Sequence, residues 1–102
     1  MAKRLRYHPL FDGDVREAAN WYDLRSPGLG EAFIAMVRKR VNDVIADPNR
    51  YGRTPSGCRY VRLTRFPYLL LFEITEDELL LLGVLHTARS LEKWRQSRAE
   101  DG

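Results

Sequence analysis

The strongest constraint on the fold is an apolar run near the end of the chain. Residues 79–85 read Leu-Leu-Leu-Leu-Gly-Val-Leu. Side chains of a strand alternate between its two faces, so a strand made of this run carries no polar side chain on either face. Such a strand belongs in the interior of a sheet, with other elements covering both sides. We therefore expect a central strand here, between two layers of structure.

Two amphipathic helices are expected in the first half of the chain, one ending near residue 24 and the other at Asp47-Pro48, because a residue before proline disfavours helix. Apolar residues recur at helical spacing in both. The stripes are Phe11, Val15, Ala18, Ala19 and Tyr22 in the first helix, and Leu29, Phe33, Met36, Val37, Val41, Val44 and Ile45 in the second.

Capping residues indicate where these helices begin. Asp14 and Glu17 form the pattern of a capping box, and Asp12 is an alternative cap for the first helix. Ser26 followed by Pro27 is typical of the start of a second helix. The link between the two is so short that they must form an antiparallel hairpin.

Strands and one short helix account for the rest of the chain. The strands are expected at residues 5–8, 60–64, 68–74 and 79–85, and the helix at residues 90–98. Residues 48–57 form a loop by composition. The resulting order, β-α-α-β-β-β-α, predicts an α+β fold in which a small antiparallel sheet packs against an N-terminal αα-hairpin. The length, 102 residues, fits a single domain over residues 1–102.

Arginines are concentrated where acids are absent. The formal charge is +3, and residues 48–72 contain no Asp, Glu or Lys. This window holds five arginines: Arg50, Arg53, Arg59, Arg62 and Arg65. The guanidinium group suits phosphate and carboxylate oxygens, which indicates an anion-binding face. The alternative is a set of solvated side chains on strand faces.

Several kinds of site are excluded or disfavoured. The single cysteine, Cys58, allows no internal disulfide, and we expect it to be a packed small hydrophobe. His8 and His86 lack the spacing of metal ligands, so no metal or cofactor is expected. No secretory signal is visible, and acids interrupt the apolar stretch 69–85, so no membrane association and a cytoplasmic location are expected.

His86 lies at the end of the predicted central strand, with Arg89 three residues later. One interpretation is structural: the ring caps the strand by hydrogen bonding to nearby backbone. The other is a proton donor or phosphate contact beside Arg62 and Arg89, as RNA cleavage would require. No second proton carrier is evident, because the sequence does not show on which face of the sheet Glu73 lies.

Two apolar features call for a partner or a cover. Leu69 and Leu71 share one face of their strand, which must be covered by the C-terminal helix or by another chain. Trp21 lies off the main stripe of the first helix, where it is able to face a partner.

At this point the sequence resembles the RelE/ParE family of bacterial toxins. Phe-Pro-Tyr between two strands and His-x-x-Arg after the last strand form the more specific pair of motifs. The residues that carry the resemblance are Trp21-Tyr22, Ser26-Pro27-Gly28-Leu29, Phe33, Pro48, the run from Arg62 to Tyr68, the run from Val84 to Arg89, and Trp94. The family implies an antiparallel sheet on a helical hairpin and the toxin half of a toxin–antitoxin pair. It also implies a cognate antitoxin that wraps the toxin in a hetero-oligomer, with Trp21, Leu69, Leu71 and Trp94 as candidate contacts.

The family divides by target, and three functions remain open. The motif pair and the absence of a C-terminal tyrosine resemble the ParE branch, which poisons DNA gyrase; target contacts would come from Arg59, Arg62, Arg65, His86, Arg89 and Arg98. A RelE-like alternative cuts mRNA in the ribosome, with His86, Arg89 and Arg62 as candidate catalytic residues. The third alternative is a non-toxic basic interaction module.

Overall fold

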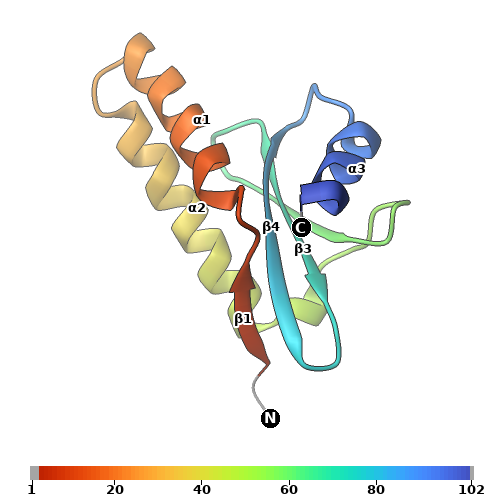
Figure 1. The fold of residues 1–102 in the computed structure, drawn as a ribbon. Helices are drawn as coiled ribbons and strands as arrows, with labels where there is room; N and C mark the ends of the chain where they lie inside the picture. Colours follow the sequence, from red (N-terminus) through yellow and green to blue (C-terminus); the bar gives the residue numbers. More distant parts are fainter. Residues whose placement is uncertain (1–2, 102) are drawn as a thin grey trace.

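The computed structural model describes residues 3–101 and has three layers (Figure 1). A helical hairpin covers one face of a four-stranded sheet, and a shorter helix covers the other face. The elements are β1 (Arg4–Tyr7), α1 (Phe11–Arg25), α2 (Leu29–Ala46), a 3₁₀ turn (Pro48–Arg50), β2 (Arg59–Arg62), β3 (Tyr68–Ile74), β4 (Glu78–His86) and α3 (Leu91–Asp101). The expected order and the α+β class are confirmed.

The apolar strand β4 lies inside the sheet, as its composition predicts. The strand order is β1-β4-β3-β2, with β2–β3 and β3–β4 antiparallel. β1 pairs with β4 in parallel, so the sheet is mixed and not wholly antiparallel as expected. The difference has a simple cause: a tight hairpin turn forces neighbouring strands to be antiparallel, whereas β1 and β4 are separated by most of the chain.

Both faces of β4 are buried in separate apolar clusters. Leu79, Leu81 and Val84 pack toward the helical hairpin, whereas Leu82 and Leu85 pack toward α3. The register with β3 changes in mid-strand, because Phe72 pairs with Leu81 while Leu71 pairs with Gly83. Leu82 is therefore an extra residue in β4, a β-bulge that shifts the alternation of every later residue by one position.

Helix α1 begins earlier than the capping pattern predicts. It starts at Phe11, with Leu10 at the N-cap position and no side-chain cap. Neither predicted cap is used: Asp12 pairs with Arg16 at 2.8 Å on the helix surface, and Asp14 turns toward α3. The capping-box prediction for Asp14 is therefore wrong, because a tertiary ion pair takes this carboxylate.

Helix α2 begins later than predicted. Ser26 is not its cap; instead the Leu29 N–H donates to the Ser26 carbonyl at 3.0 Å and closes a turn. Gly28 occupies the left-handed region, with φ 90° and ψ −14°. These angles match the third position of a type II turn, which favours glycine after proline. The Pro27-Gly28 pair therefore reverses the chain before the helix starts.

The predicted antiparallel hairpin of α1 and α2 is confirmed, and Gly30 allows its close approach. A Cβ atom at Gly30 would collide with the backbone carbonyl oxygen of Ala19 and lie 2.6 Å from the Asp23 carboxyl group. The Gly30 N–H donates to the Asp23 side chain at 2.7 Å. This bond satisfies one of the free N–H groups at the start of α2.

Three further observations bear on the kinds of partner considered. Within residues 3–101, no helix is both long and apolar enough to cross a membrane. The described residues also include no group of three His, Cys, Asp or Glu side chains placed to hold a metal ion. Cys58 is buried in the cluster under α3, as predicted for a packed hydrophobe.

Candidate functional site

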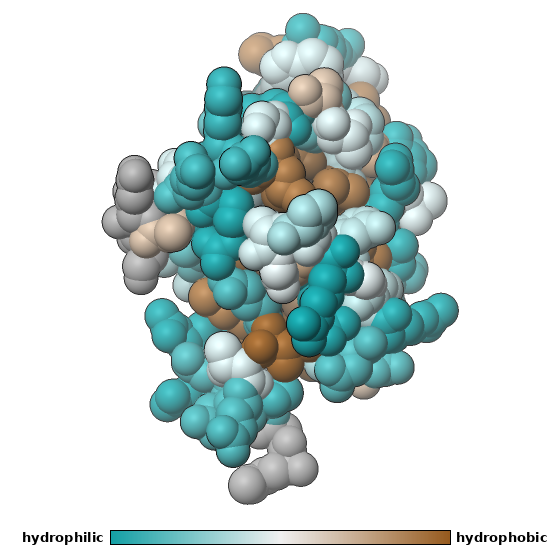
Figure 2. Space-filling model, turned by 90° about the vertical axis from the view of Figure 1, so that its right-hand side faces the viewer, coloured by the Kyte–Doolittle hydropathy of each residue, from teal (hydrophilic) through white to brown (hydrophobic). Residues whose placement is uncertain are grey.

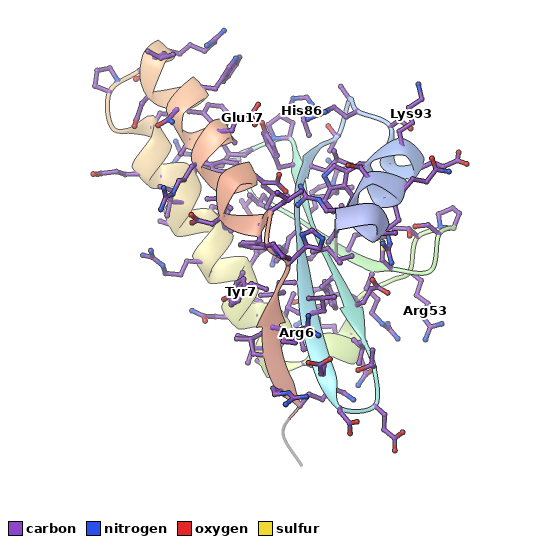
Figure 3. The ribbon with its side chains drawn as sticks, viewed as in Figure 1. Arg6, Tyr7, Glu17, Arg53, His86 and Lys93 are labelled. Atoms are coloured by element: carbon purple, nitrogen blue, oxygen red, sulfur yellow. The ribbon has the colours of Figure 1, made fainter. Side chains whose placement is uncertain are left out.

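An open cleft lies where α1, α3 and the end of β4 meet. Its volume is about 690 Å³, within the range typical of ligand sites. Val84 and His86 of β4 line it, with Glu17 and Trp21 from α1 and Trp94 from α3. Figure 3 places Glu17 and His86 at the same end of the molecule, near the top of the view.

His86 ends β4, and backbone contacts fix its ring. The Nδ1 atom accepts a hydrogen bond from the Ala88 N–H at 3.0 Å, while the Arg89 N–H donates to the His86 carbonyl at 3.0 Å. The strand-capping interpretation is therefore confirmed. Because Nδ1 is an acceptor, the neutral ring carries its hydrogen on Nε2. With Nδ1 occupied by the Ala88 N–H, Nε2 is the ring nitrogen that remains to donate a hydrogen bond, so the backbone positions His86 as a donor.

Tyr68 and Glu17 also line the cleft, and sequence reasoning missed both as site residues. Tyr68 pairs with His86 across β3 and β4, and their rings meet edge to face at 5.1 Å. Burial raises the pKa of Tyr68, with smaller contributions from Tyr22 and Glu17 and an opposing one from Arg89. The phenol therefore stays protonated at neutral pH and offers a hydrogen-bond donor beside the imidazole.

Four predicted target-binding residues are brought to one end of the sheet. Strand register aligns Arg62 with Leu69 of β3 and Leu69 with Leu85 of β4, next to the strand end. The following loops are joined by a hydrogen bond of 2.9 Å from the Thr87 N–H to the Pro67 carbonyl. We call the basic residues of these strand ends and loops the basic end: Arg62, Arg65, His86 and Arg89.

The three arginines of the basic end are exposed. Within the described residues, none of their guanidinium groups has a carboxylate oxygen within 4.0 Å, whereas Arg4, Arg6, Arg16, Arg40, Arg95 and Arg98 each do. Arg65 also has a positive φ of 75°, which is uncommon for a residue with a side chain. Strained residues of this kind cluster at functional sites.

Two predicted target-binding residues lie elsewhere. Arg59 is at the opposite end of β2, where its Nη1 donates to the Tyr51 carbonyl at 2.6 Å. Arg98 is buried, with 5% of its surface exposed, because it faces Asp14 across the interface between α3 and α1. Arg98 is thus a structural residue in this conformation, and its assignment to an exposed basic surface is corrected.

Arg98 lies at the centre of a polar network that holds α3. Its Nη2 atom donates to both carboxylate oxygens of Asp14 at 2.5 Å, and its carbonyl accepts from His8 Nε2 at 3.0 Å. The Val84 N–H lies near the Asp14 carboxylate. Burial raises the pKa of Asp14, whereas the bonds from Arg98 and Val84 act in the opposite direction. The network ties α1, β4 and α3 together.

The candidate antitoxin contacts differ in exposure. Helix α3 covers Leu71, which is fully buried, and Leu69 and Trp94 are half-buried in the same cluster. The C-terminal helix is thus the cover required by this face, and Leu71 has no exposed surface to offer a partner. Trp21 is 48% exposed, with the Arg25 guanidinium stacked 3.4 Å above its ring.

The space-filling view shows how hydrophobic residues are distributed on one face of the molecule. On the face in Figure 2, hydrophobic residues form only small areas between hydrophilic ones. Large apolar patches on soluble domains indicate obligate partner surfaces. The absence of one on this face fits a cover supplied by the protein's own α3.

The fold defines a class: small α+β proteins in which a helical hairpin backs a sheet with a basic end. Residues 5–91 match the family model of the ParE toxin of type II toxin–antitoxin system, parDE. The match covers more than half of the chain, which therefore belongs to the ParE toxin family. The resemblance drawn from the sequence is confirmed.

Comparison with solved structures supports the same fold. A chain in the chromosomal ParDE TA system from P. aeruginosa superimposes with a TM-score of 0.72 and 19% sequence identity. The match covers 82% of the present chain and 95% of that chain. No curated protein sequence gives a significant match. At this identity the structural likeness shows a shared fold, while the family model shows the membership.

Proposed function

We propose that this ParE-family toxin inhibits DNA gyrase through its basic end and that a cognate antitoxin neutralises it by binding. The observation that carries the proposal is the hydrogen bond from the Ala88 N–H to His86 Nδ1. It makes the imidazole a fixed donor, which suits recognition of a macromolecule more than proton transfer. A toxin with this target acts in the cytoplasm.

The basic end supplies the electrostatic part of this recognition. Arg62, Arg65 and Arg89 carry exposed guanidinium groups that pair with no carboxylate of the described residues. Unpaired charges of one sign at one end of a protein steer an oppositely charged partner and raise the rate of encounter. Gyrase holding its DNA presents phosphates and protein carboxylates to such a surface.

The test uses purified toxin, active gyrase and plasmid DNA. Wild-type toxin is expected to block supercoiling or to accumulate cleaved plasmid. The triple variant Arg62→Ala/Arg65→Ala/Arg89→Ala is expected to need at least about tenfold more protein for the same effect. Arg38→Ala is the matched control, since Arg38 is exposed on α2. No effect of wild type on verified gyrase would contradict the proposal.

A ribosome-dependent endoribonuclease is the second candidate. One observation favours it: Tyr68 and Glu17 share the cleft with His86 and Arg89, which supplies the further polar groups that RNA cleavage needs. Primer extension on a message in a translating extract tests this function. The His86 geometry predicts no cleavage. Cuts that disappear in His86→Ala and Arg89→Ala would establish the nuclease instead.

The antitoxin is proposed to bind as a separate chain in a hetero-oligomer. Trp21 is the most exposed of the candidate contacts, and Leu69 and Trp94 offer part of their surfaces. Expression of the chain alone in a bacterium is expected to arrest growth, and co-expression of the cognate antitoxin to restore it. Normal growth with verified expression would favour the non-toxic basic module.

A further inference from the structure

The outer edge of β4 is paired over only part of its length. β1 accompanies β4 from Glu78 to Leu81, and the His8 N–H makes the last contact, donating to the Leu81 carbonyl at 2.8 Å. After this point the chain leaves the sheet and enters α1. No strand of residues 3–101 lies beside the remaining part of this edge, from Val84 to His86.

Strand register shows where the backbone groups of this part point. The Thr87 N–H donates to the Pro67 carbonyl, so the backbone of Thr87 faces the β3 side. Directions alternate along a strand, so the backbone groups of His86 and Val84 face the opposite side. The bulge at Leu82 produces this alternation, because without it these groups would point toward β3.

Two of these groups have no partner. The Val84 N–H lies near the Asp14 carboxylate, whereas the Val84 carbonyl and the His86 N–H make no hydrogen bond with any described residue. Val84 and His86 line the cleft, so this free edge opens between α1 and α3. Unpaired strand edges are templates for the addition of another strand.

The charges around the cleft favour a polypeptide over a nucleic acid. Asp14 and Glu17 balance Arg89 and Arg98, and the Asp14–Arg98 pair is satisfied internally. A phosphate polymer needs a net positive groove. Trp21 and Trp94 stand on opposite walls, α1 and α3, and offer aromatic surface to an apolar side chain.

We propose that an extended, uncharged segment of the target protein adds to the free edge of β4 and lies in the cleft between α1 and α3. It accepts a hydrogen bond from the His86 N–H, donates one to the Val84 carbonyl, and places an apolar side chain between the two tryptophans. The cleft adjoins the basic end, so one partner can occupy both; this inference rests on the proposed function. A strand rises about 3.3 Å per residue, so about three residues of the partner meet this edge.

Two substitutions at position 86 distinguish the contribution of the backbone N–H from that of the side chain. His86→Pro removes the N–H that points into the cleft, and this N–H takes no part in the β3–β4 ladder. His86→Ala removes the same ring and keeps the N–H. In the gyrase supercoiling assay, His86→Pro is expected to inhibit at least about tenfold less strongly than His86→Ala. Circular dichroism and thermal unfolding establish that both variants fold.

Hydrogen exchange provides a measurement that needs no variant. In the wild-type toxin, the segment containing Val84 to His86 is expected to exchange more slowly when gyrase is added, while the exposed β3–β4 turn keeps its rate. This measurement decides the question if His86→Pro does not fold. Unchanged exchange in a toxin that inhibits gyrase would overturn strand addition.

The outcomes distinguish this inference from the proposed function. If wild-type toxin does not inhibit gyrase, the proposed function fails and the inference fails with it. If wild type inhibits and the two variants inhibit equally, only strand addition is wrong. If His86→Pro inhibits as well as His86→Ala but loses affinity for the cognate antitoxin, the edge belongs to the antitoxin, and the assignment to the target is overturned.

Discussion

The guanidinium of Arg98 on α3 donates hydrogen bonds to the carboxylate of Asp14 on α1, with Nη2 at 2.5 Å from both oxygens. Arg98 is 5% exposed, and its Cζ atom lies 4.7 Å from the Trp94 ring centroid. Gly83 makes room for this pair, because a Cβ atom there would collide with the Asp14 carboxylate. The C-terminal helix is therefore held to the rest of the protein by a buried ion pair as well as by apolar contacts.

Removing one partner of this pair is expected to destabilise the protein strongly. Arg98→Met leaves the partly buried Asp14 carboxylate without its ion-pair partner. Breaking a buried pair on one side costs about 3–5 kcal/mol, and the residual exposure of Asp14 suggests the lower end of that range. Urea unfolding, followed by tryptophan fluorescence, measures the change in the free energy of unfolding.

The double variant Asp14→Ala/Arg98→Met is the control for this prediction. It removes the uncompensated charge together with its partner, so it is expected to lose less stability than Arg98→Met alone. A double variant that is less stable than the single one would show that packing of the two side chains, and not their charge, holds α3 in place.

Gly30 and Gly13 form a matched pair of helical glycines. Gly30→Ala is expected to cost about 1–3 kcal/mol, because its methyl group would push α2 away from Ala19 and Asp23. Gly13→Ala is expected to stabilise α1 by about 0.5–1 kcal/mol, since nothing lies within 4 Å of the added carbon and alanine favours helix. Thermal unfolding of both variants gives the comparison, and equal effects would show that hairpin contact does not select glycine at position 30.

The sequence predicts which helices and strands form, but it predicts their end residues and the pairing of strands less well. The apolar composition of residues 79–85 is sufficient to place β4 inside the sheet, because no other position buries both faces. The start of α1 escapes prediction, since Asp14 has the composition of a cap but is taken by Arg98, which is distant in sequence. The parallel pairing of β1 is likewise a tertiary contact without a local signal.

The sequence likewise predicts some residues of the candidate site and misses others. Arg62, Arg65, His86 and Arg89 come together because hairpin connections bring consecutive strand ends to one side of the sheet. Tyr68 is missed because the pairing of Ile74 with Leu79, continued without a bulge, would place it opposite Leu85. The extra residue at Leu82 shifts it to His86. The uniformly apolar run 79–85 does not locate this bulge, because a shift in alternation still leaves apolar side chains on both faces.

Tyr68 is expected to make stability depend on alkaline pH. Its folded pKa is raised above the ordinary value of 10.0, so the folded protein holds this proton more tightly than the unfolded chain does. The resulting stabilisation is complete below the unfolded pKa and is lost as the pH rises through the folded pKa. Tyr68→Phe removes the titration. Its stability relative to wild type is therefore expected to be constant from pH 7 to 9 and to rise above about pH 10.

Urea midpoints for wild type and Tyr68→Phe at pH 8, 9, 10 and 11 test this dependence. Tyr22 has a pKa raised by burial as well, so Tyr22→Phe reports its separate contribution. A stability difference between Tyr68→Phe and wild type that stays the same from pH 8 to pH 11 would mean that the phenolate of Tyr68 is as well solvated in the folded protein as in the unfolded chain.

Association with the cognate antitoxin is expected to weaken as salt is added. The net charge of +3 and the unpaired arginines of the basic end attract an acidic partner, and a Debye length of about 10 Å at 0.1 M salt screens that attraction. The triple variant Arg62→Ala/Arg65→Ala/Arg89→Ala should show a shallower dependence of log Kd on log salt than wild type. Arg38→Ala, which removes one exposed charge from α2, should change the slope much less. Isothermal titration from 50 to 500 mM salt measures the slopes. Equal slopes for the triple variant and wild type would show that the antitoxin binds away from the basic end, leaving this surface free for the toxin's target.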